Sequence, residues 1–538
     1  MAQPSPLPTI DTFVLTFNAG KAPINTPVIA NHLYNAFGNN ATSLPELVVI
    51  SLQEMAPLAK AFVGSYVLQP YFQRYESAVN LAAAKFLVAR QEEGEVEPVP
   101  SEDRSPYKLA TVRNVGMTGI MLLARDPTAL HNIRTTELGF GAGSMANKGA
   151  VGLRFMYTTE GKDNDSDGQT SRATEMTFVS THLQAMEWNL ETRNRNWESI
   201  VSGLVFEDPK KYILPPPSAR GGGAEGEEAH DLLERDRDEA QKSALHDLSI
   251  YKPGTHLFVS GDLNYRISTT SPGSGAVFPS LDPDSPDHYA RFLPLDQLTA
   301  EKEAGRTLHG LTEAAIKFPP TYKLKVSPKK QKPGSTEARD GSTVSAAARQ
   351  GDGEEQQLQD VEDEDVDWEW AIHRWPGWCD RVLYLDIPWW AKEGVASSST
   401  KTSPSSSMDI IAYDALPAVR TSDHRAVYLR VAVPALEPTE LAPSSAAIEA
   451  ELVRSGSNNN SEGDGGNGNG QNLVVDPRVR LPFPIDTNSW HHRAVVKEWE
   501  RVLGWSMLVS QSRPAIALFA TVLVVGLGVW LYHTPGFF

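Results

Sequence analysis

Short apolar runs recur along most of the chain, and nearly all of them have the length and pattern of β-strands. Residues 9–17 alternate apolar and polar side chains, whereas residues 47–52 are almost wholly apolar, as in a strand buried on both faces. Similar runs occupy residues 117–124, 150–155, 176–183, 256–263, 379–385 and 426–433. Helix-like spacing covers residues 26–37, 186–206 and 231–248. Because strands dominate and often follow one another directly, the pattern predicts an α/β (α+β) fold of packed mixed sheets with outer helices.

Polar stretches of low complexity interrupt and then end this pattern. Residues 209–227 are rich in Pro and Gly, and residues 326–367 begin basic and end acidic, so we expect both to be disordered surface insertions. After residue 433 the composition shifts to Pro, Ser, Ala, Gly and Asn, which predicts a flexible linker over residues 434–487. The strand-rich region at 8–433 is therefore expected to form one large catalytic domain.

The C-terminal region carries two further patterns. Residues 488–512 have apolar side chains at helical spacing and three tryptophans, which predicts an amphipathic helix that either lies on a membrane surface or docks on the large domain. Residues 514–532 form a run of 19 residues without a charge, and about 20 apolar residues are needed to cross a bilayer. We therefore expect a transmembrane helix at 513–533, with Trp530 and Tyr532 at one interface.

The charge balance limits the classes of partner. The formal net charge is −18 with a pI near 5.2, which argues against a general nucleic-acid-binding protein. Ten acidic residues and no basic one lie between Asp352 and Glu369, so a local basic pocket elsewhere is still allowed. The chain has one cysteine, Cys379, and its N-terminus shows no secretory pattern. Both features favour a cytosolic location for the large domain.

Polar residues follow several of the apolar runs at the point where each run ends. The segment HLFVSGDLNYRI begins as a buried strand and finishes with Asp262, Asn264 and Arg266. The other such positions are Asn18, Glu54, His182, Asp423 and His424. Active sites of α/β folds are built at strand ends, so we expect these side chains to meet. Carboxylate and amide oxygens suit Mg²⁺, whereas the chain has no CxxC or HExxH motif for zinc.

Three blocks of sequence, in this order, resemble those of the inositol polyphosphate 5-phosphatases. They are GDLNYR (261–266), PGWCDRVLY (376–384) and SDHRAV (422–427). Further similar segments are NKGAVGLRF (147–155), STHLQA (180–185), TRNRNWESI (192–200) and FPPTYKL (318–324). This family belongs to the DNase I-like, Mg²⁺-dependent phosphoesterases, and the resemblance spans residues 8–433. It implies a four-layer α-β-β-α sandwich of two packed mixed sheets, here with a C-terminal transmembrane helix as in tail-anchored fungal-type members.

The resemblance also implies a role for each matching residue in binding the metal and activating water. Glu54 would be the main Mg²⁺ ligand, with Asn18 and Asp423 assisting it. Asp262 would orient and deprotonate the attacking water, and Asn264 would hold both the water and the phosphate. Mg²⁺ would polarise the phosphoryl oxygen and stabilise the leaving hydroxyl.

A second group of residues would bind the phosphates. His424 would contact the scissile phosphate, Asp380 would fix the tautomer of His424, and His182 would be a second phosphate contact. The residues implied to bind the rest of the substrate are Lys148, Tyr322, Lys323, Arg374 and Arg381. One position departs from the family, since Ile372 stands where a lysine is common.

Together these features predict an enzyme that hydrolyses the 5-phosphate of phosphatidylinositol 4,5-bisphosphate at a membrane surface. The 3,4,5-trisphosphate and soluble inositol phosphates are further candidate substrates. We expect a monomeric catalytic domain on the cytosolic side of the endoplasmic reticulum, anchored by its C-terminal helix, with no nucleic-acid partner. The alternatives are a nuclease of the same fold and an inactive tether that only binds phosphoinositides.

Overall fold

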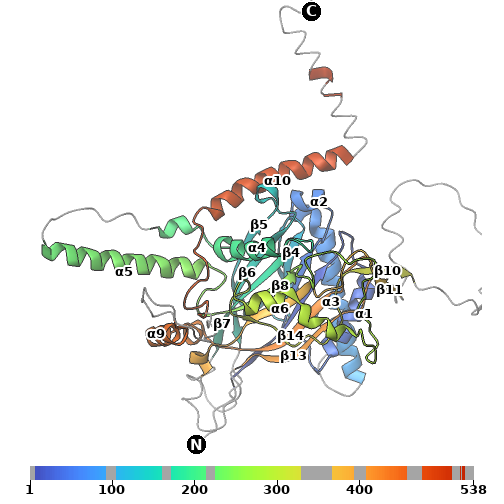
Figure 1. Cartoon of the computed structure of the whole chain (residues 1–538), viewed down its shortest axis with the longest axis horizontal. Helices are drawn as coiled ribbons and strands as arrows, with labels where there is room; N and C mark the ends of the chain where they lie inside the picture. The colour runs from blue at the N-terminus through green and yellow to red at the C-terminus, as the bar shows by residue number, and fades with distance from the viewer. Residues whose placement is uncertain are drawn as a thin grey trace, which may run out of the picture.

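The computed structural model describes most of the chain from residue 7 to residue 511. The described residues are 7–92, 105–159, 171–213, 224–328, 366–392, 407–456, 475–511, 521–522 and 524–526, with side chains from residue 235 onward in the range that begins at 224. Two six-stranded sheets form the centre of this structure, and helices lie on their outer sides (Figure 1).

The first sheet has the strand order β13-β14-β1-β2-β4-β3. Its strands are β1 (Thr9–Asn18), β2 (Leu47–Gln53), β3 (Lys108–Val115), β4 (Thr118–Ala124), β13 (Asp409–Ala415) and β14 (Val427–Pro434). β1 runs parallel to β2 and antiparallel to β14. The carboxyl ends of β1 and β2 and the start of β14 therefore lie at one edge of the sheet.

The second sheet has the strand order β5-β6-β7-β8-β12-β9. Its strands are β5 (Leu130–Gly139), β6 (Gly149–Thr159), β7 (Arg172–His182), β8 (Thr255–Asp262), β9 (Leu311–Thr312) and β12 (Asp380–Leu385). β7 and β8 are parallel, and β12 is antiparallel to β8. Because both sheets combine parallel and antiparallel pairs, the prediction of two packed mixed sheets is confirmed.

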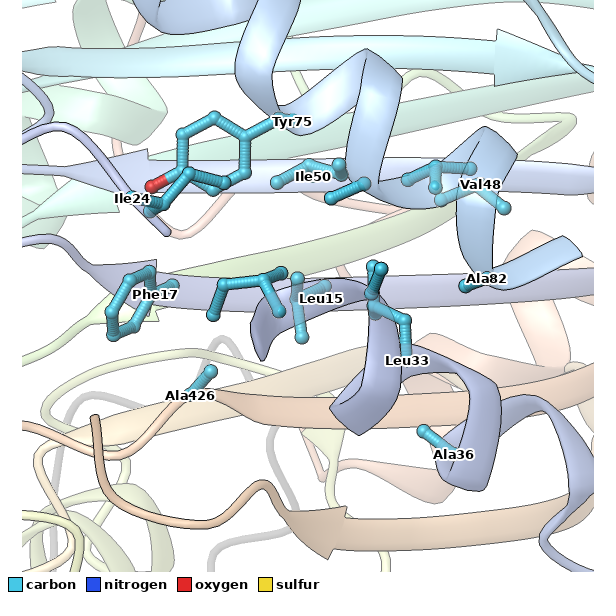
Figure 2. Packing of buried hydrophobic residues seen from close by; sticks show 14 of the residues in the cluster. Leu15, Phe17, Ile24, Leu33, Ala36, Val48, Ile50, Tyr75, Ala82 and Ala426 are labelled. Atoms are coloured by element: carbon cyan, nitrogen blue, oxygen red, sulfur yellow. The ribbon is translucent and has the colours of Figure 1, made fainter. Parts of the chain in front are cut away.

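Alternation along the strands produces the layers. In β1, Val14 faces the second sheet and packs in the same cluster as Phe178 and Phe258. The neighbouring Leu15 and Phe17 point to the opposite side, where they pack with Ile50 of β2 under two helices (Figure 2). Successive strand side chains point to opposite faces, so a strand buried on both sides, such as β2, is largely apolar.

Helices cover both outer faces of the pair of sheets. The first sheet is covered by α1 (Thr26–Gly38) and α3 (Ser65–Glu92), with the short α2 (Leu58–Val63) between β2 and α3. On the second sheet, Trp197 and Ile200 of α4 (Leu190–Gly203) pack on Val179, Val259 and Leu383. The remaining helices before β9 are α5 (Ala224–Leu248) and α6 (Gln297–Glu303).

The predicted insertions have ordered ends. The first was expected to extend to residue 227, but α5 begins at Ala224, where alanine and glutamates favour a helix. The second was expected to cover 326–367, but β10 (Leu324–Pro328) pairs with β11 (Val366–Trp370) across its base. Backbone pairing therefore overrides the polar composition there. The middles of both insertions lie outside the described residues.

The predicted boundary at residue 433 and the linker at 434–487 are wrong in part. The chain continues into α8 (Pro438–Leu441) and α9 (Ser445–Arg454). Leu441 is fully buried in the core between the sheets. Arg478 is 4% exposed, and its guanidinium donates to the carbonyl of Asp386 at 2.8 Å. One apolar anchor and one buried arginine thus hold both ends of this segment, while residues 457–474 lie outside the described structure.

Helix α10 (Ser489–Gln511) docks on the large domain and lies across α2 and β5 (Figure 1), as one of the two arrangements expected from its sequence requires. Arg493 donates to both carboxylate oxygens of Glu500 at 2.8 and 2.6 Å and to Glu137 of β5 at 3.3 Å. Gly504 allows close contact with α2, since a Cβ there would lie 2.9 Å from the backbone nitrogen of Val63.

Among the described residues, no helix is both long and apolar enough to cross a membrane. The predicted transmembrane segment at 513–533 lies outside the described structure except for residues 521–522 and 524–526. Its membrane-spanning role therefore stays a prediction.

Glu137 makes the docking of α10 sensitive to acid. Burial raises its pKa, but Arg113, Lys497 and Arg493 outweigh burial and hold it below the ordinary 4.5. The stabilisation that ionised Glu137 gives to the docked helix is therefore present above pH 4.5 and is lost as the pH falls through the lowered pKa. We predict that Glu137→Gln weakens docking by roughly 1–3 kcal/mol at neutral pH and abolishes this acid dependence.

Hydrogen exchange of the α10 amides, compared between wild type and variant at each pH, measures the effect. Glu449→Gln on the exposed face of α9 is the control and should leave α10 unchanged. Equal protection of α10 in wild type and Glu137→Gln would show that Glu137 does not support the docked helix.

Candidate active site

The strand ends of the two sheets meet at one edge of the sandwich. Asn18 ends β1 and Asp262 ends β8, and the Asn18 amide donates to the Asp262 carboxylate at 2.9 Å across the two sheets. His182 and Asp380 are the β-sheet partners of Asp262 on its two sides. His424, just before β14, lies with its Nε2 3.9 Å from Asp262. Residues that lie far apart along the chain therefore form one polar cluster.

Asp262 is the centre of this cluster and is only 1% exposed. Besides Asn18, its carboxylate contacts His182 Nε2 at 3.1 Å and accepts the backbone N–H of Asn264 at 3.1 Å. Burial raises the pKa of Asp262, but His182 and His424 outweigh burial and hold the pKa well below its usual range. The carboxylate is therefore ionised although almost no water reaches it.

His424 is held as a cation. Its Nδ1 lies 2.8 Å from Asp380, whose carboxylate also accepts the hydroxyl of Thr321 at 2.7 Å. Burial lowers the pKa of His424, but Asp380 and Asp262 together raise it to about 9. Asp380 thus fixes both the orientation and the charge of the ring, and the ring's other nitrogen faces Asp262.

His182 has the opposite charge state. It is fully buried, and Lys148 Nζ contacts its Nε2. Burial and Lys148 lower the pKa of His182 below 6.5, against the opposing effect of Asp262. A neutral and a charged imidazole therefore flank one ionised carboxylate, which is the kind of separation of pKa values that assigns different roles in catalysis.

Glu54 follows β2 directly and is the more accessible acid, with 23% of its side chain exposed. It lies 3.1 Å from Lys21 and 3.9 Å from Lys148. Burial raises its pKa, but His182, Lys148 and Lys21 hold it below its ordinary value. Its backbone has φ +45° and that of Asn264 has φ +56°, a region that costs non-glycine residues about 1–3 kcal/mol and that clusters at functional sites.

The donor set fits a hard divalent cation. Asp262, Asp380 and His424 have ligand atoms within 4.8 Å of one another, but protonated His424 has no free lone pair to offer. Glu54 and Asp423 are more accessible to such an ion, because their side chains are 23% and 35% exposed and Mg²⁺ prefers carboxylates together with water. Asn18 offers an amide oxygen at the end of β1, where it accepts the backbone N–H of Gly20 at 3.2 Å.

The residues predicted to bind substrate fall into two groups. Lys148 lies inside the cluster, Lys323 pairs with Asp423, and the Tyr322 ring lies 4.5 Å from that of His424. Arg374 is near the rim, where it pairs with Glu187 at 3.4 Å.

The prediction for Arg381 is wrong. Its side chain is 1% exposed and binds Glu313 at 2.5 Å and Asp296 at 3.0 Å. It follows Asp380 in a strand and so points to the opposite face of the sheet. Its guanidinium is saturated there and ties α6 and the segment after β9 to β12.

Arg266 belongs to the site, although its sequence pattern gave it no specific role. It is 3% exposed, donates to the Asn264 side chain at 2.5 Å, and lies 4.2 Å from the centre of the Tyr322 ring. Its Nη1 has no hydrogen-bond partner among the described residues. The signal was its place in the GDLNYR block, two residues after Asn264. Lys21 and Thr321 also contact site residues, and no pattern in the sequence marked Lys21.

Comparison with known proteins gives several relatives. The Saccharomyces cerevisiae protein "Polyphosphatidylinositol phosphatase INP53" is 29% identical over 189 residues, covering 35% of this chain and 12% of that protein. The Arabidopsis thaliana "Type II inositol polyphosphate 5-phosphatase 14" is 24% identical over 330 residues, covering 61% and 23%. The chain thus spans less than a quarter of the length of these relatives.

A solved structure and a family model also match. The structure is the inositol polyphosphate 5-phosphatase domain of a synaptojanin in complex with inositol (1,4)-bisphosphate and calcium, at 20% identity and a TM-score of 0.44, covering 79% of this chain and 84% of that one. Residues 15–341, well over half of the 538-residue chain, match the model described as Endonuclease/Exonuclease/phosphatase family 2. The chain therefore belongs to the endonuclease/exonuclease/phosphatase family 2.

Proposed function

We propose that this protein is a Mg²⁺-dependent phosphatase that hydrolyses the 5-phosphate of a phosphoinositide, with phosphatidylinositol 4,5-bisphosphate as the first candidate. The observation that carries the proposal is the buried Asp262 carboxylate, which lies 3.1 Å from His182 on one side and 3.9 Å from His424 on the other. Relatives of the chain are named as polyphosphatidylinositol and inositol polyphosphate phosphatases. This arrangement suits direct attack of water on a phosphoryl group.

Asp262 would position the water. Asn18, His182 and the backbone of Asn264 fix the orientation of its carboxylate. Because its pKa is held low, Asp262 orients the water and accepts its proton only as the phosphorus–oxygen bond forms. The bond between phosphorus and the inositol oxygen then breaks, and the inositol oxygen gains a proton.

Cationic groups would stabilise the negative charge that develops on the phosphoryl oxygens. His424 carries a positive charge fixed by Asp380, and Lys148 and Arg266 add two more within the same cluster. Preoriented charges in a site that excludes water are commonly the largest contribution to such catalysis. The lone cysteine has no part in this chemistry, since burial raises the pKa of the Cys379 thiol well above its usual range.

Glu54 would hold Mg²⁺, with Asn18 and Asp423 beside it. When bound, the ion would polarise a phosphoryl oxygen and neutralise charge on the leaving oxygen. Tyr322 and Lys323 border the same site and would bind the phosphate next to the scissile one. Ile372 is 80% exposed and brings no charge to the position where the family commonly has lysine, so Arg374 would carry recognition on that side.

We propose further that the chain is a single-pass, tail-anchored protein of the endoplasmic reticulum with its catalytic domain in the cytosol. The support is the uncharged run at 514–532, which begins three residues after the end of α10. Such an anchor would confine the enzyme to the surface that carries its lipid substrate and raise its effective concentration there.

Asp262→Asn should abolish phosphate release while the protein stays folded, because an amide cannot take a proton from water. We expect a loss of at least about 100-fold with short-chain phosphatidylinositol 4,5-bisphosphate and Mg²⁺. The control is Asp238→Asn on the exposed side of α5, which should retain full activity. Undiminished release by Asp262→Asn, or cleavage of duplex DNA in place of lipid phosphate, would reject the proposed function.

Asp380→Asn should discharge His424. In the metal-free protein, the variant removes the negative charge of Asp380 that stabilises protonated His424. The pKa of His424 should therefore fall from about 9 toward or below the ordinary 6.5. The stability that charged His424 contributes is fully present below pH 6.5 and is lost as the pH rises through 9, so the variant should lack this dependence.

NMR titration of the imidazole signals measures the change directly. The signal of His131, which is exposed on β5, serves as the internal control. An unchanged pKa of His424 in Asp380→Asn would contradict the charge assignment.

Membrane topology can be tested in cells. A chain truncated after Ser512 should be extracted from membranes by alkaline carbonate, whereas the full chain should remain. Asn40, Asn164 and Asn459 each begin an N-x-Ser/Thr sequence, and none should carry a glycan if the domain is cytosolic. Extraction of the full chain, or a glycosidase-sensitive mass shift, would overturn the anchor or its orientation respectively.

A further inference from the structure

Helix α10 buries charged side chains and exposes apolar ones, which is the reverse of an ordinary helix on the surface of a protein. Its face toward the domain carries the buried, charged Arg493 and Glu500 together with Gly504 and Val496. A surface helix ordinarily turns its apolar face to the core and its charged face to solvent. Here buried ion pairs hold the helix in place, and its apolar side chains are left for another surface.

The outer face of α10 carries several exposed apolar side chains, with the exposed Glu498 and Ser506 among them. Val495, Trp499, Val502 and Trp505 are 60%, 64%, 59% and 56% exposed, and Val509 is 37% exposed one turn later. At 3.6 residues per turn these positions lie on the side opposite Arg493 and Glu500. Two indole rings within one stripe are typical of a helix at a membrane interface, where amphipathic rings are favoured.

The inner face contacts two segments that lie close in sequence to residues of the active site. The Glu500 carboxylate accepts the backbone N–H of Ala146 at 2.7 Å, and Ala146 lies two residues before Lys148. His492 contacts the Ser144 hydroxyl at 3.1 Å in the same turn. Gly504 packs on α2, which begins four residues after Glu54. The helix is therefore joined to the chain segments that carry Lys148 and Glu54.

Continuity along the chain identifies the occupant of the outer face. The uncharged run at 514–532 begins three residues after Gln511, the last residue of α10. If that run enters a bilayer, the end of α10 lies at the bilayer surface. An apolar face that bears tryptophans and continues directly into such a segment matches a lipid interface in chemistry and in position.

We propose that the outer face of α10 docks flat on the lipid bilayer and, through its ion-paired inner face, holds the active site in a fixed orientation at the membrane. The proposal rests on the membrane anchoring proposed above and extends it. In this arrangement α10 forms the contact between the catalytic domain and the bilayer, and the domain has one fixed orientation on it. Residues of the outer face therefore affect hydrolysis of a substrate in the membrane, although they do not contact the reacting atoms.

The test places a fluorescent probe on each of two faces of the full chain. Val502→Cys on α10 and Val453→Cys on α9, which is 60% exposed, are labelled with bimane; Cys379 is fully buried and does not react. Each protein is reconstituted into phosphatidylcholine–phosphatidylserine vesicles with or without bromine on the acyl chains. The probe at 502 should shift to shorter wavelength and be quenched by brominated lipid, whereas the probe at 453 should show neither effect.

Two results of this labelling experiment would overturn the proposal. A probe at 502 that stays water-exposed and unquenched would show that the face does not meet lipid. Cross-linking of two Val502→Cys chains to each other would instead assign the face to a second copy of the protein.

A kinetic comparison separates this proposal from the proposed function. Trp499→Gln combined with Val502→Gln should lower phosphate release from vesicle-borne phosphatidylinositol 4,5-bisphosphate by roughly tenfold and leave release from the short-chain substrate unchanged. Ile448→Gln combined with Val453→Gln on α9 is the matched control. An equal loss on both substrates would mean that the face supports only the fold of the site, which overturns the proposal. If even the wild type releases no phosphate from either substrate, the proposed function fails, while the quenching result still decides the docking surface.

Discussion

The structure depends on keeping one carboxylate ionised where almost no water reaches it. An unpaired charge in a protein interior costs several kcal/mol, so Asp262 requires nearby groups that compensate for its lost hydration. The Asn18 amide, His182, His424 and the backbone of Asn264 supply this compensation. These groups come from both sheets, so the sheets must pack with their strand ends at the same edge. The position of the active site and the packing of the fold thus follow from a single constraint.

Two histidines beside this carboxylate show how one neighbour sets a charge state. Both rings are buried and both approach Asp262, but His182 also touches Lys148 whereas His424 is bound to Asp380. The first neighbour lowers the histidine pKa and the second raises it. Each side of Asp262 therefore has a fixed chemical character, a hydrogen-bonding group on one side and a cation on the other. That asymmetry is what a site for an incoming phosphate and a water molecule needs.

The sequence predicted the parts of this arrangement that leave a pattern along the chain. An apolar run that ends in a polar residue marks a strand end, and the repetition of this pattern along the chain singles out Asn18, Glu54 and Asp262. Lys21 lies three residues after Asn18 in the loop beyond β1, where no apolar run marks it, and it was therefore missed. Arg381 was misassigned because a motif shows which residues are adjacent, whereas alternation in the strand sends adjacent side chains to opposite faces. The linker was overextended because one buried leucine, Leu441, outweighs a polar composition around it.

The sequence of α10 predicts a helix, but it does not predict which face of that helix is buried. Periodicity divides a helix into two faces but does not say which face is inside, and the usual rule would have buried the tryptophans. The structure buries Arg493 and Glu500 instead, which is favourable only because Glu137 and the Ala146 backbone complete their pairing. Such a face costs desolvation energy that an apolar face would not. A chain that accepts this cost leaves apolar side chains of α10 exposed to solvent, and the proposed docking on lipid would bury them.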